Sequence, residues 1–218
     1  MLSQSQLATM LSLQDAMNKK VNPEWLSAGY AYLRAAMIES VEAIEHHGWK
    51  WWKSQSCDLP QVQMELVDIW HFALSHLLIS YEGDAEKAAQ QIVTQASLPN
   101  AVILFDGNEF AYQSASLVEN LELMAGLCVV GRFDVSLFMH IVEQAEMRAD
   151  DLFEQYVGKN ILNFFRQDHG YKTGEYIKIW DGREDNEHLV EVLAALDPLH
   201  KDYSNEVYKA LAARYPKD

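Results

Sequence analysis

Cysteine is scarce in this sequence, and the two present, Cys57 and Cys128, exclude two common ways of holding a protein together. Neither stands in a spacing typical of a metal site, and two cysteines do not make a disulfide framework. The 218 residues are therefore expected to form an ordinary hydrophobic core, as one domain or one domain with a small appendage. A content of 49% hydrophobic and 22% charged residues is typical of such a protein.

Basic residues are also few, with 17 Lys and Arg against 32 Asp and Glu and a net charge of −15. Such a surface would repel nucleic acids and anionic membranes, so neither is an expected partner. A small anionic substrate carried by metal ions is compatible with this charge. The chain lacks an apolar run of the roughly 18–20 residues that span a membrane, and its N-terminus does not resemble a signal peptide. A cytoplasmic location is the default expectation.

Strand patterns are equally rare, whereas apolar residues recur at helical spacing along most of the chain. We therefore expect an all-α helical bundle, with residues 1–218 as a single domain whose core covers 5–186 and is followed by C-terminal helices in 187–218. The predicted helices cover residues 5–20, 27–47, 62–81, 86–94, 117–130, 134–156, 187–196 and 202–214.

Ser27 is the expected N-cap of the second helix. Two segments are less certain in type. The apolar run 101–105 fits either a short strand or a buried helical turn, and periodicity does not decide between them. Residues 159–186, rich in Asn, Lys, Arg, Gly and Tyr, are expected to form a structured loop. Because basic residues concentrate there in an otherwise acidic protein, an anion-binding role is favoured over a plain surface loop.

Two carboxylate pairs at helical spacing, Glu39/Glu42 and Glu65/Asp68, flank a turn that contains residues 49–53. Residues three apart lie on one side of a helix, so the four carboxylates converge if the turn folds the two helices together. The spacing alone is weak evidence, because the chain has nine acid-x-x-acid pairs and most must be solvated helix faces.

The environment of Glu65 and Asp68 distinguishes them from the other pairs. The helix over 62–81 is apolar nearly all round, as a buried helix is. A buried carboxylate costs roughly several kcal/mol unless it is paired or binds a metal. Since this helix carries no Lys or Arg, a divalent cation is the expected partner. His71 continues the same helical series, but a lone histidine there is more often a hydrogen-bonded core residue than a ligand.

Two further groups have competing interpretations. On residues alone, Gln14 and Asn18 are favoured as solvent-facing amides, because exposed amides are common on such faces. At least one of the tryptophans of the 49–53 turn is expected to cover the core as an aromatic plug. Lys50 and Lys53 of the same turn could instead face the acidic cluster or a phosphate.

Taken together, these motifs resemble the all-α nucleoside triphosphate pyrophosphohydrolases, and more narrowly the dimeric dUTPases. The resemblance is carried, in order, by LQDAMN at 13–18, the Glu39/Glu42 pair, WKWWK at 49–53, ELVDIWHF at 65–72 and the KNILN, FRQD and GYK segments within 159–172. Met17 stands where the family's first motif usually has leucine, a volume-conserving change. Residues 82–113 match nothing in the family pattern.

The resemblance implies a Mg²⁺-dependent dUTP diphosphatase, with Mn²⁺ as a substitute, that converts dUTP and also dUDP to dUMP in a homodimer. The implied metal ligands are Glu39, Glu42, Glu65 and Asp68, an all-carboxylate set that suits Mg²⁺ or Mn²⁺. Either Glu39 or Glu42 would act as general base. The implied substrate-binding residues are Gln14, Asn18, Trp51, Lys53, Lys159, Asn160, Asn163, Arg166, Tyr171 and Lys172.

Three alternatives remain open at this point. A related pyrophosphohydrolase with another nucleotide preference would keep the four carboxylates without needing the amide and basic motifs. A di-iron carboxylate bundle would need Glu-x-x-His twice, and the core helices offer only Asp68-x-x-His71. A non-enzymatic nucleotide-binding module could keep the amides and lose a metal ligand, but all four carboxylates are present.

Overall fold

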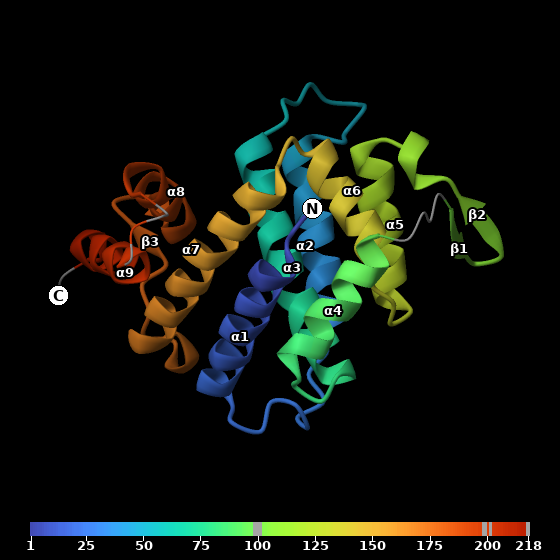
Figure 1. The fold of residues 1–218 in the computed structure, drawn as a ribbon. Helices are drawn as coiled ribbons and strands as arrows, with labels where there is room; N and C mark the ends of the chain where they lie inside the picture. The colour runs from blue at the N-terminus through green and yellow to red at the C-terminus, as the bar shows by residue number, and fades with distance from the viewer. Residues whose placement is uncertain (98–101, 198–199, 201, 217–218) are drawn as a thin grey trace.

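The computed structural model describes residues 1–97, 102–197, 200 and 202–216. Helices dominate these residues, so the predicted all-α fold class is confirmed (Figure 1). The helices are α1 (Gln4–Val21), α2 (Tyr32–His47), α3 (Leu59–Ser80), α4 (Ala85–Ala96), α5 (Leu117–Val129), α6 (Val135–Gln144), α7 (Ala149–Asp168), α8 (Asp185–Ala195) and α9 (Tyr203–Arg214). None of the helices in the described ranges is long and apolar enough to cross a membrane.

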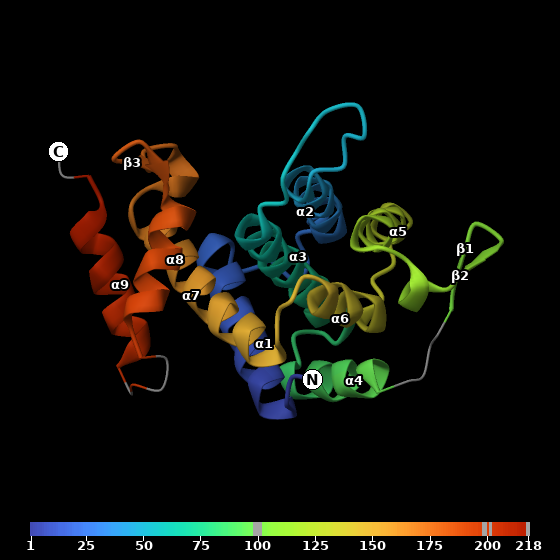
Figure 2. The same cartoon turned by 90° about the horizontal axis from the view of Figure 1, so that it is seen from above.

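Helix α3 is the centre of the main core. It packs against α2 on one side and against α1 and α7 on the other, and α2 in turn packs against α5 (Figure 2). Leu66, Trp70 and Leu74 of α3 are completely buried. The apolar character that runs nearly all round this segment in the sequence thus has its structural reason, because helices surround it.

Helix α7 connects two hydrophobic clusters. Its first half contributes Leu152 and Tyr156 to the main core. Its second half contributes Leu162 and Phe165 to a smaller cluster with α8, α9 and the hairpin strand that holds Trp180. In Figure 1 the helices α8 and α9 accordingly lie across α7 from the rest of the bundle. Side chains along one face of α7 can therefore contact both the main bundle and the C-terminal helices.

The predicted start of the second helix was wrong. Helix α2 begins at Tyr32 after Ala31, which provides no side-chain cap, and Ser27 instead donates its hydroxyl to the carbonyl of Glu24. Gly29 explains the delay, since it adopts a left-handed conformation with φ of 68° that interrupts helical geometry. At the other end, Gly48 stops the helix with φ of 83°, as expected.

The predicted long helix 134–156 is two helices. After α6, Glu146 takes a left-handed conformation with φ of 56°, and the Met147 amide bonds back to the carbonyl of Val142 at 3.1 Å. This is the hydrogen bonding of a helix C-terminus. Asp151 then accepts the Arg148 amide at 2.9 Å and starts α7. Apolar periodicity continues across the break, which is why it does not show in the pattern.

The predicted loop 159–186 is helical over its first ten residues, because α7 runs to Asp168. Polar residues in this part are buried against other helices, so tertiary contacts override the loop-like composition. A short 3-10 turn and the hairpin of β3 (Ile179–Trp180) and β4 (Arg183–Glu184) follow.

Residues 103–105 of the apolar run 101–105 form a strand, and Ala101 lies outside the described residues. Strand β1 (Ile103–Phe105) pairs antiparallel with β2 (Asn108–Phe110). The turn between them has Asp106 and Gly107 at φ of 49° and 76°, the sequence and geometry of a tight hairpin.

Candidate active site

Three carboxylates converge where α2 packs along α3. Oxygen atoms of Glu39, Glu42 and Glu65 lie within 4.8 Å of one another. Glu65 is 7% exposed, Glu39 is partly buried and Glu42 faces solvent. The two helices therefore fold together as the carboxylate spacing predicted, and they create a group of oxygen donors suited to a hard divalent cation.

Asp68, the fourth acidic residue, has a partner that the sequence argument did not consider. Lys159 Nζ of α7 lies 2.7 Å from Asp68 Oδ2, and the Lys159 side chain is only 2% exposed. The argument for a metal asked only about cations on the same helix, whereas this one comes from a helix far along the chain. Asp68 thus has an ion-pair partner within the protein, although its charge still contributes to the repulsion at Glu39 and Glu65.

The electrostatics of this group reflect crowding of like charges. Burial, followed by repulsion from Asp68 and Glu42, raises the pKa of Glu39 to about 7. Burial, followed by repulsion from Asp68 and Glu39, raises the pKa of Glu65 to about 8. The Nε2 atom of His46 lies 3.5 Å from Glu65 Oε1. Such a group gains strongly from a divalent cation, which would relieve the repulsion.

The carboxylates form one wall of a cleft of about 660 Å³. The opposite wall comes from α7 and the segment after it. It brings Lys159, Arg166 and Lys178 to face the acids of α2 and α3, and Figure 2 shows these helices on either side. The lining residues are Glu39, Glu42, His46, Asp58, Gln61, Glu65, Asp68, Lys159, Arg166, Tyr171, Lys178, Glu184, Asn186 and Glu187.

A buried polar chain lies between α1, α3 and α7. Gln14 and Asn18 are 5% and 7% exposed, so the interpretation of solvent-facing amides was wrong. Gln14 Nε2 donates to Asn18 Oδ1 at 3.1 Å, and Asn18 Nδ2 donates to Ser75 Oγ at 3.0 Å. The Tyr156 hydroxyl lies 2.8 Å from Gln14 Oε1 and 2.9 Å from the carbonyl of Met10, so two acceptors share its one proton. The amides are therefore held in fixed orientations inside the protein.

His71 lies beside this chain. Its ring stacks on Tyr156 at 4.1 Å between centroids, and Nδ1 lies 2.9 Å from the carbonyl of Val67. It is thus the hydrogen-bonded core histidine that was expected. Burial lowers the pKa of His71 to about 4, so the ring is neutral at pH 7. Its Nε2 is buried without a hydrogen-bond partner among the described residues.

The remaining predicted residues of α7 extend the same region. Asn160 is 1% exposed, with its amide 3.5 Å from the carbonyl of Leu13. Asn163 accepts a hydrogen bond from Arg166 at 3.3 Å. The Arg166 guanidinium lies 5.7 Å from the ring centre of Tyr171, which lines the cleft.

Seven predicted substrate-binding residues do not line the cleft, namely the amide residues Gln14, Asn18, Asn160 and Asn163, and Trp51, Lys53 and Lys172. Trp51 is 89% exposed and Lys53 is also exposed, both in the turn after α2. Lys172 donates to the carbonyl of Val21 at the end of α1. The expected aromatic plug was also wrong, because Trp49 and Trp52 are 41% and 56% exposed. Short turns hold these rings on one another, edge to face, instead of on the core.

Sequence reasoning missed several contributors to this region, including His46, Asp58, Gln61, Glu184 and Glu187 of the cleft lining. Lys178 and Asn186 line the cleft, and Asp185 is fully buried against Arg166. Ser75 completes the amide chain on α3. For Lys178, Asp185 and Asn186, the available signal was the EDN run at 184–186, which immediately follows a basic segment. Nothing in the sequence pattern distinguished Ser75.

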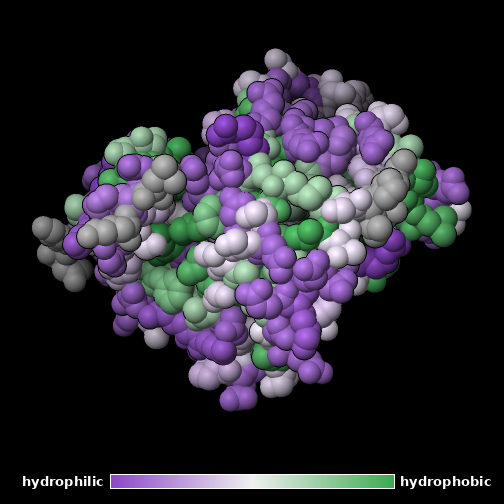
Figure 3. Space-filling model, in the orientation of Figure 1, coloured by the Kyte–Doolittle hydropathy of each residue, from purple (hydrophilic) through white to green (hydrophobic). Residues whose placement is uncertain are grey.

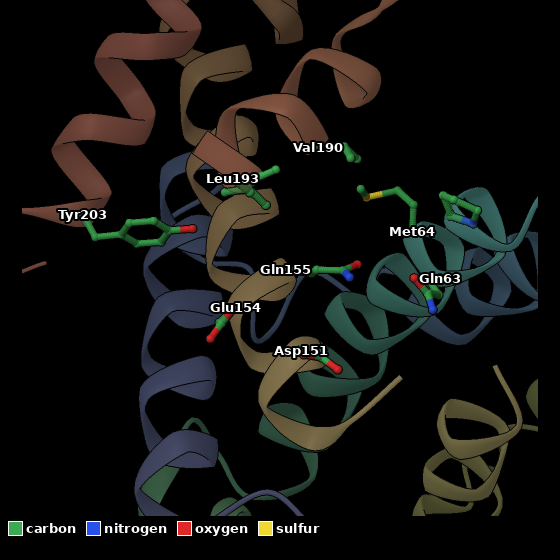
Figure 4. A pocket seen from close by; sticks show the side chains of 10 residues that line it. Gln63, Met64, Asp151, Glu154, Gln155, Val190, Leu193 and Tyr203 are labelled. Carbon is green, nitrogen blue, oxygen red and sulfur yellow. The ribbon is translucent and has the colours of Figure 1, made fainter. Parts of the chain in front are cut away.

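A second hollow of about 290 Å³ continues along the gap between α3 and α8. Met64 of α3 and Val190 of α8 face each other across it, with Leu193 nearby (Figure 4). On the face shown in Figure 3, hydrophobic residues likewise gather in the seam between the C-terminal helices and the rest of the molecule. The C-terminal helices are thus joined to the rest of the molecule mainly through α7 and through polar contacts in the cleft.

Fold and site together define an all-α protein in which a carboxylate cluster faces cations across one cleft. The family model for dUTPase matches residues 6–171, well over half of the chain, and the protein belongs to this family. The match supports a dUTP diphosphatase type of function. No curated protein sequence gave a match to the chain.

Proposed function

We propose that the protein is a Mg²⁺-dependent dUTP diphosphatase that hydrolyses dUTP, and dUDP, to dUMP. The observation that carries this proposal is the cleft itself, in which Glu39, Glu42 and Glu65 face Lys159 and Arg166 in a chain of the dUTPase family. Acids suit the metal ions that accompany a nucleotide, and the facing cations suit its phosphates. Few ligands other than a metal-bound nucleotide would need both an acidic and a basic wall in one cleft.

The donor set fits Mg²⁺, with Mn²⁺ as a substitute. Glu39, Glu42 and Glu65 offer only oxygen ligands, and burial together with repulsion between carboxylates raises the pKa values of Glu39 and Glu65, which supports a site for a divalent cation. Asp68 would join them as the fourth ligand. When bound, the metal would neutralise phosphate charge and polarise the phosphoryl group. Proton transfer, phosphate contact and base recognition would be carried out by side chains of the protein.

Glu39 is the better candidate for the general base. Its partial burial restricts bulk water around the carboxylate that must accept the proton from the attacking water. Glu42 faces solvent and serves better as a metal ligand. Lys159, Arg166 and Lys178 would contact phosphate oxygens, with Lys178 taking the part expected of Lys172.

The buried amides would recognise the base. Uracil presents two carbonyl groups and one N–H on its edge, and Gln14 and Asn18 both donate and accept hydrogen bonds. Their fixed orientation, with Asn160 on the facing helix, supports selection by hydrogen bonding rather than by size alone. Asn163 and Tyr171 would lie toward the sugar. Trp51 and Lys53 stay predicted substrate contacts, although neither lines the cleft.

We also propose that the protein is a homodimer. Apolar side chains remain exposed on α2 and at the end of α5, including Ile38 and Val41 at 45% and 46% and Val129 at 71%. An exposed apolar group of this kind favours burial against a second copy. Light scattering coupled to size-exclusion chromatography tests this directly, and a monomer at micromolar concentration would refute it. A cytoplasmic location belongs to the same proposal.

The test of function is pyrophosphate release from dUTP, dTTP, dCTP and UTP, each with and without Mg²⁺. We expect turnover of dUTP only with the metal, and its loss in Glu42→Gln. Turnover of another nucleotide would keep the mechanism and refute the base assignment. Tight binding without turnover would replace the enzyme with a nucleotide-binding module.

A further inference from the structure

Asp185 and Asn186 open helix α8, beyond the residues that match the family, and hold the two cations of α7. Asp185 is 0% exposed and receives Arg166 Nε at 2.8 Å and Nη2 at 2.9 Å. The side-chain oxygen of Asn186 accepts from Lys159 Nζ at 2.9 Å and from Arg166 Nη2 at 3.2 Å. One amide oxygen therefore links both cations that face the carboxylates.

The contacts of Arg166 fix its orientation almost completely. A guanidinium group has five N–H donors. Asp185 takes two of them, Asn186 a third, and Asn163 a fourth at 3.3 Å. A single donor on Nη1 is left by these contacts. Arg166 thus enters the cleft as a charge whose position is set by its protein partners before any ligand binds.

Asp185 remains an anion despite its burial. Burial acts to raise its pKa, but hydrogen bonds from Arg166 and from the Tyr176 hydroxyl outweigh this effect, and the pKa is lowered. The Tyr176 hydroxyl lies 2.7 Å from Asp185 Oδ2. A buried, ionised carboxylate with a bidentate arginine is a geometrically strict contact, since both groups are planar.

Apolar packing does not hold α8 in place on the carboxylate side. Helix α8 packs against α7 and α9. Toward α3 the hollow lined by Met64, Val190 and Leu193 separates the two helices (Figure 4). The start of α8 is therefore registered on α7 by the apolar packing of Leu189 and Val192 in the cluster shared with α7, and by the polar contacts of Asp185 and Asn186 with the two cations.

We propose that Asp185 and Asn186 are positioning residues, which place Arg166 and Lys159 to receive the phosphate chain of the nucleotide. The inference rests on the proposed function and extends the site beyond the family match. Neither residue needs to touch the base or the carboxylates. Changing them should therefore weaken recognition of the outer phosphates and spare recognition of the rest of the nucleotide.

The experiment compares Asp185→Asn and Asn186→Ser with Glu191→Gln, all on α8. Glu191 is a matched control because its carboxylate binds Arg183 and Arg214 on the exposed side of the helix, away from the cleft. For the two test variants we expect kcat/KM for dUTP to fall about 10- to 100-fold, as for other residues that orient binding groups. Affinity for a non-hydrolysable dUTP analogue should fall with it, and affinity for dUMP should change less than about twofold.

A double-mutant cycle separates positioning from general stability. In an Arg166→Ala background, Asp185→Asn should add little further loss, because its route of action has already been removed. Asn186→Ser keeps the test intact if Asp185→Asn fails to fold, since Asn186 is only partly buried.

Several outcomes would overturn the inference. The first is a kcat/KM for dUTP that is undiminished in both folded test variants. The second is an equal loss of affinity for dUMP and for the dUTP analogue. The third is a loss of kcat/KM in Glu191→Gln as large as in the test variants. Absence of dUTP turnover by the unaltered protein would instead refute the proposed function, so the two failures are distinguishable.

Discussion

Lys159 Nζ lies 2.7 Å from Asp68 Oδ2, so the chain itself supplies a cation to one of the four acidic residues. The two side chains are 2% and 19% exposed, and a pair so little solvated is screened much less than a surface pair. Lys159 also lowers the pKa values of Glu39 and Glu65 through its charge. Lys159 therefore supplies positive charge to the same carboxylates that a divalent cation would bind.

Lys159→Met should bind Mg²⁺ or Mn²⁺ more tightly and yet turn over dUTP more slowly. Removing one positive charge relieves repulsion of the metal, which we expect to improve the Kd roughly tenfold, or about 1.4 kcal/mol. The loss of a phosphate contact should lower kcat/KM by about 10²-fold. Isothermal titration calorimetry and a pyrophosphate assay measure the two effects.

The control for this prediction is Lys178→Met. Lys178 lines the cleft but pairs with Glu184 and not with the carboxylate cluster, so its removal should change metal affinity much less. If Lys159→Met binds metal as the unaltered protein does, or more weakly, Lys159 does not compete with the metal.

Glu65→Gln should inactivate the enzyme and stabilise the metal-free fold. Turnover should fall at least about 10²-fold, because a metal ligand is lost. Burial and like charges raise the pKa of Glu65 to about 8, which costs folding free energy at neutral pH. The neutral amide avoids this cost, so the metal-free protein should melt at a higher temperature. Differential scanning calorimetry in EDTA measures this. Glu122→Gln, from an exposed acid-x-x-acid pair, should alter neither property, and parallel destabilisation by both variants would contradict the prediction.

Metal-free protein should lose stability as the pH rises from about 5 to 8. Glu39 and Glu65 have folded pKa values of about 7 and 8, above those of the unfolded chain, so the native state binds more protons in this range. Stability present at low pH is then lost as these carboxyls ionise. Allowing for solvent screening and for coupling of the pair, we expect a loss of roughly 1–3 kcal/mol, or about 2–10 °C in Tm.

Saturating Mg²⁺ should remove or reverse this pH dependence, because a divalent cation favours the ionised carboxylates. Melting curves at pH 5.5, 7 and 8 with EDTA or Mg²⁺ provide the comparison. A metal-free Tm that rises steadily to pH 8 would argue against the raised pKa values.

The carboxylate wall could be predicted from sequence because its information is local. Helical spacing gives the shared face of Glu39 and Glu42, and the apolar surroundings of Glu65 give its burial. Only the turn between α2 and α3 had to bring them together. The fold class follows in the same way, since each helix carries its own apolar pattern.

The opposite wall and the amide chain depend on partners far away in sequence. Asn18 meets Ser75 and Gln14 meets Tyr156, 57 and 142 positions along the chain. Periodicity assigns a face to each residue but not the polar group that it will meet. For this reason two buried amides were taken for exposed ones, and a helix with buried Lys159 was taken for a loop.

Tyr156→Phe should reduce the preference for uracil over cytosine. The Tyr156 hydroxyl holds Gln14 Oε1 at 2.8 Å, and through Gln14 it orients the amide of Asn18. Uracil presents a carbonyl group and an adjacent ring N–H where cytosine presents an amino group and an unprotonated ring nitrogen. An amide fixed in one orientation therefore pairs with one base and leaves unpaired groups against the other. Without the hydroxyl, the Gln14 amide can turn over and satisfy either base.

We therefore expect the ratio of kcat/KM for dUTP to that for dCTP to fall at least about tenfold, with part of the change arising from faster dCTP turnover. Tyr208→Phe is the matched control, because that hydroxyl donates to Asp168 on the exposed side of α7. Loss of the buried hydroxyl should also lower stability by about 1–3 kcal/mol, since Gln14 loses a partner. A lower Tm with an unchanged ratio would mean that Tyr156 supports the fold alone, and the base would then be selected by groups other than the Gln14 amide.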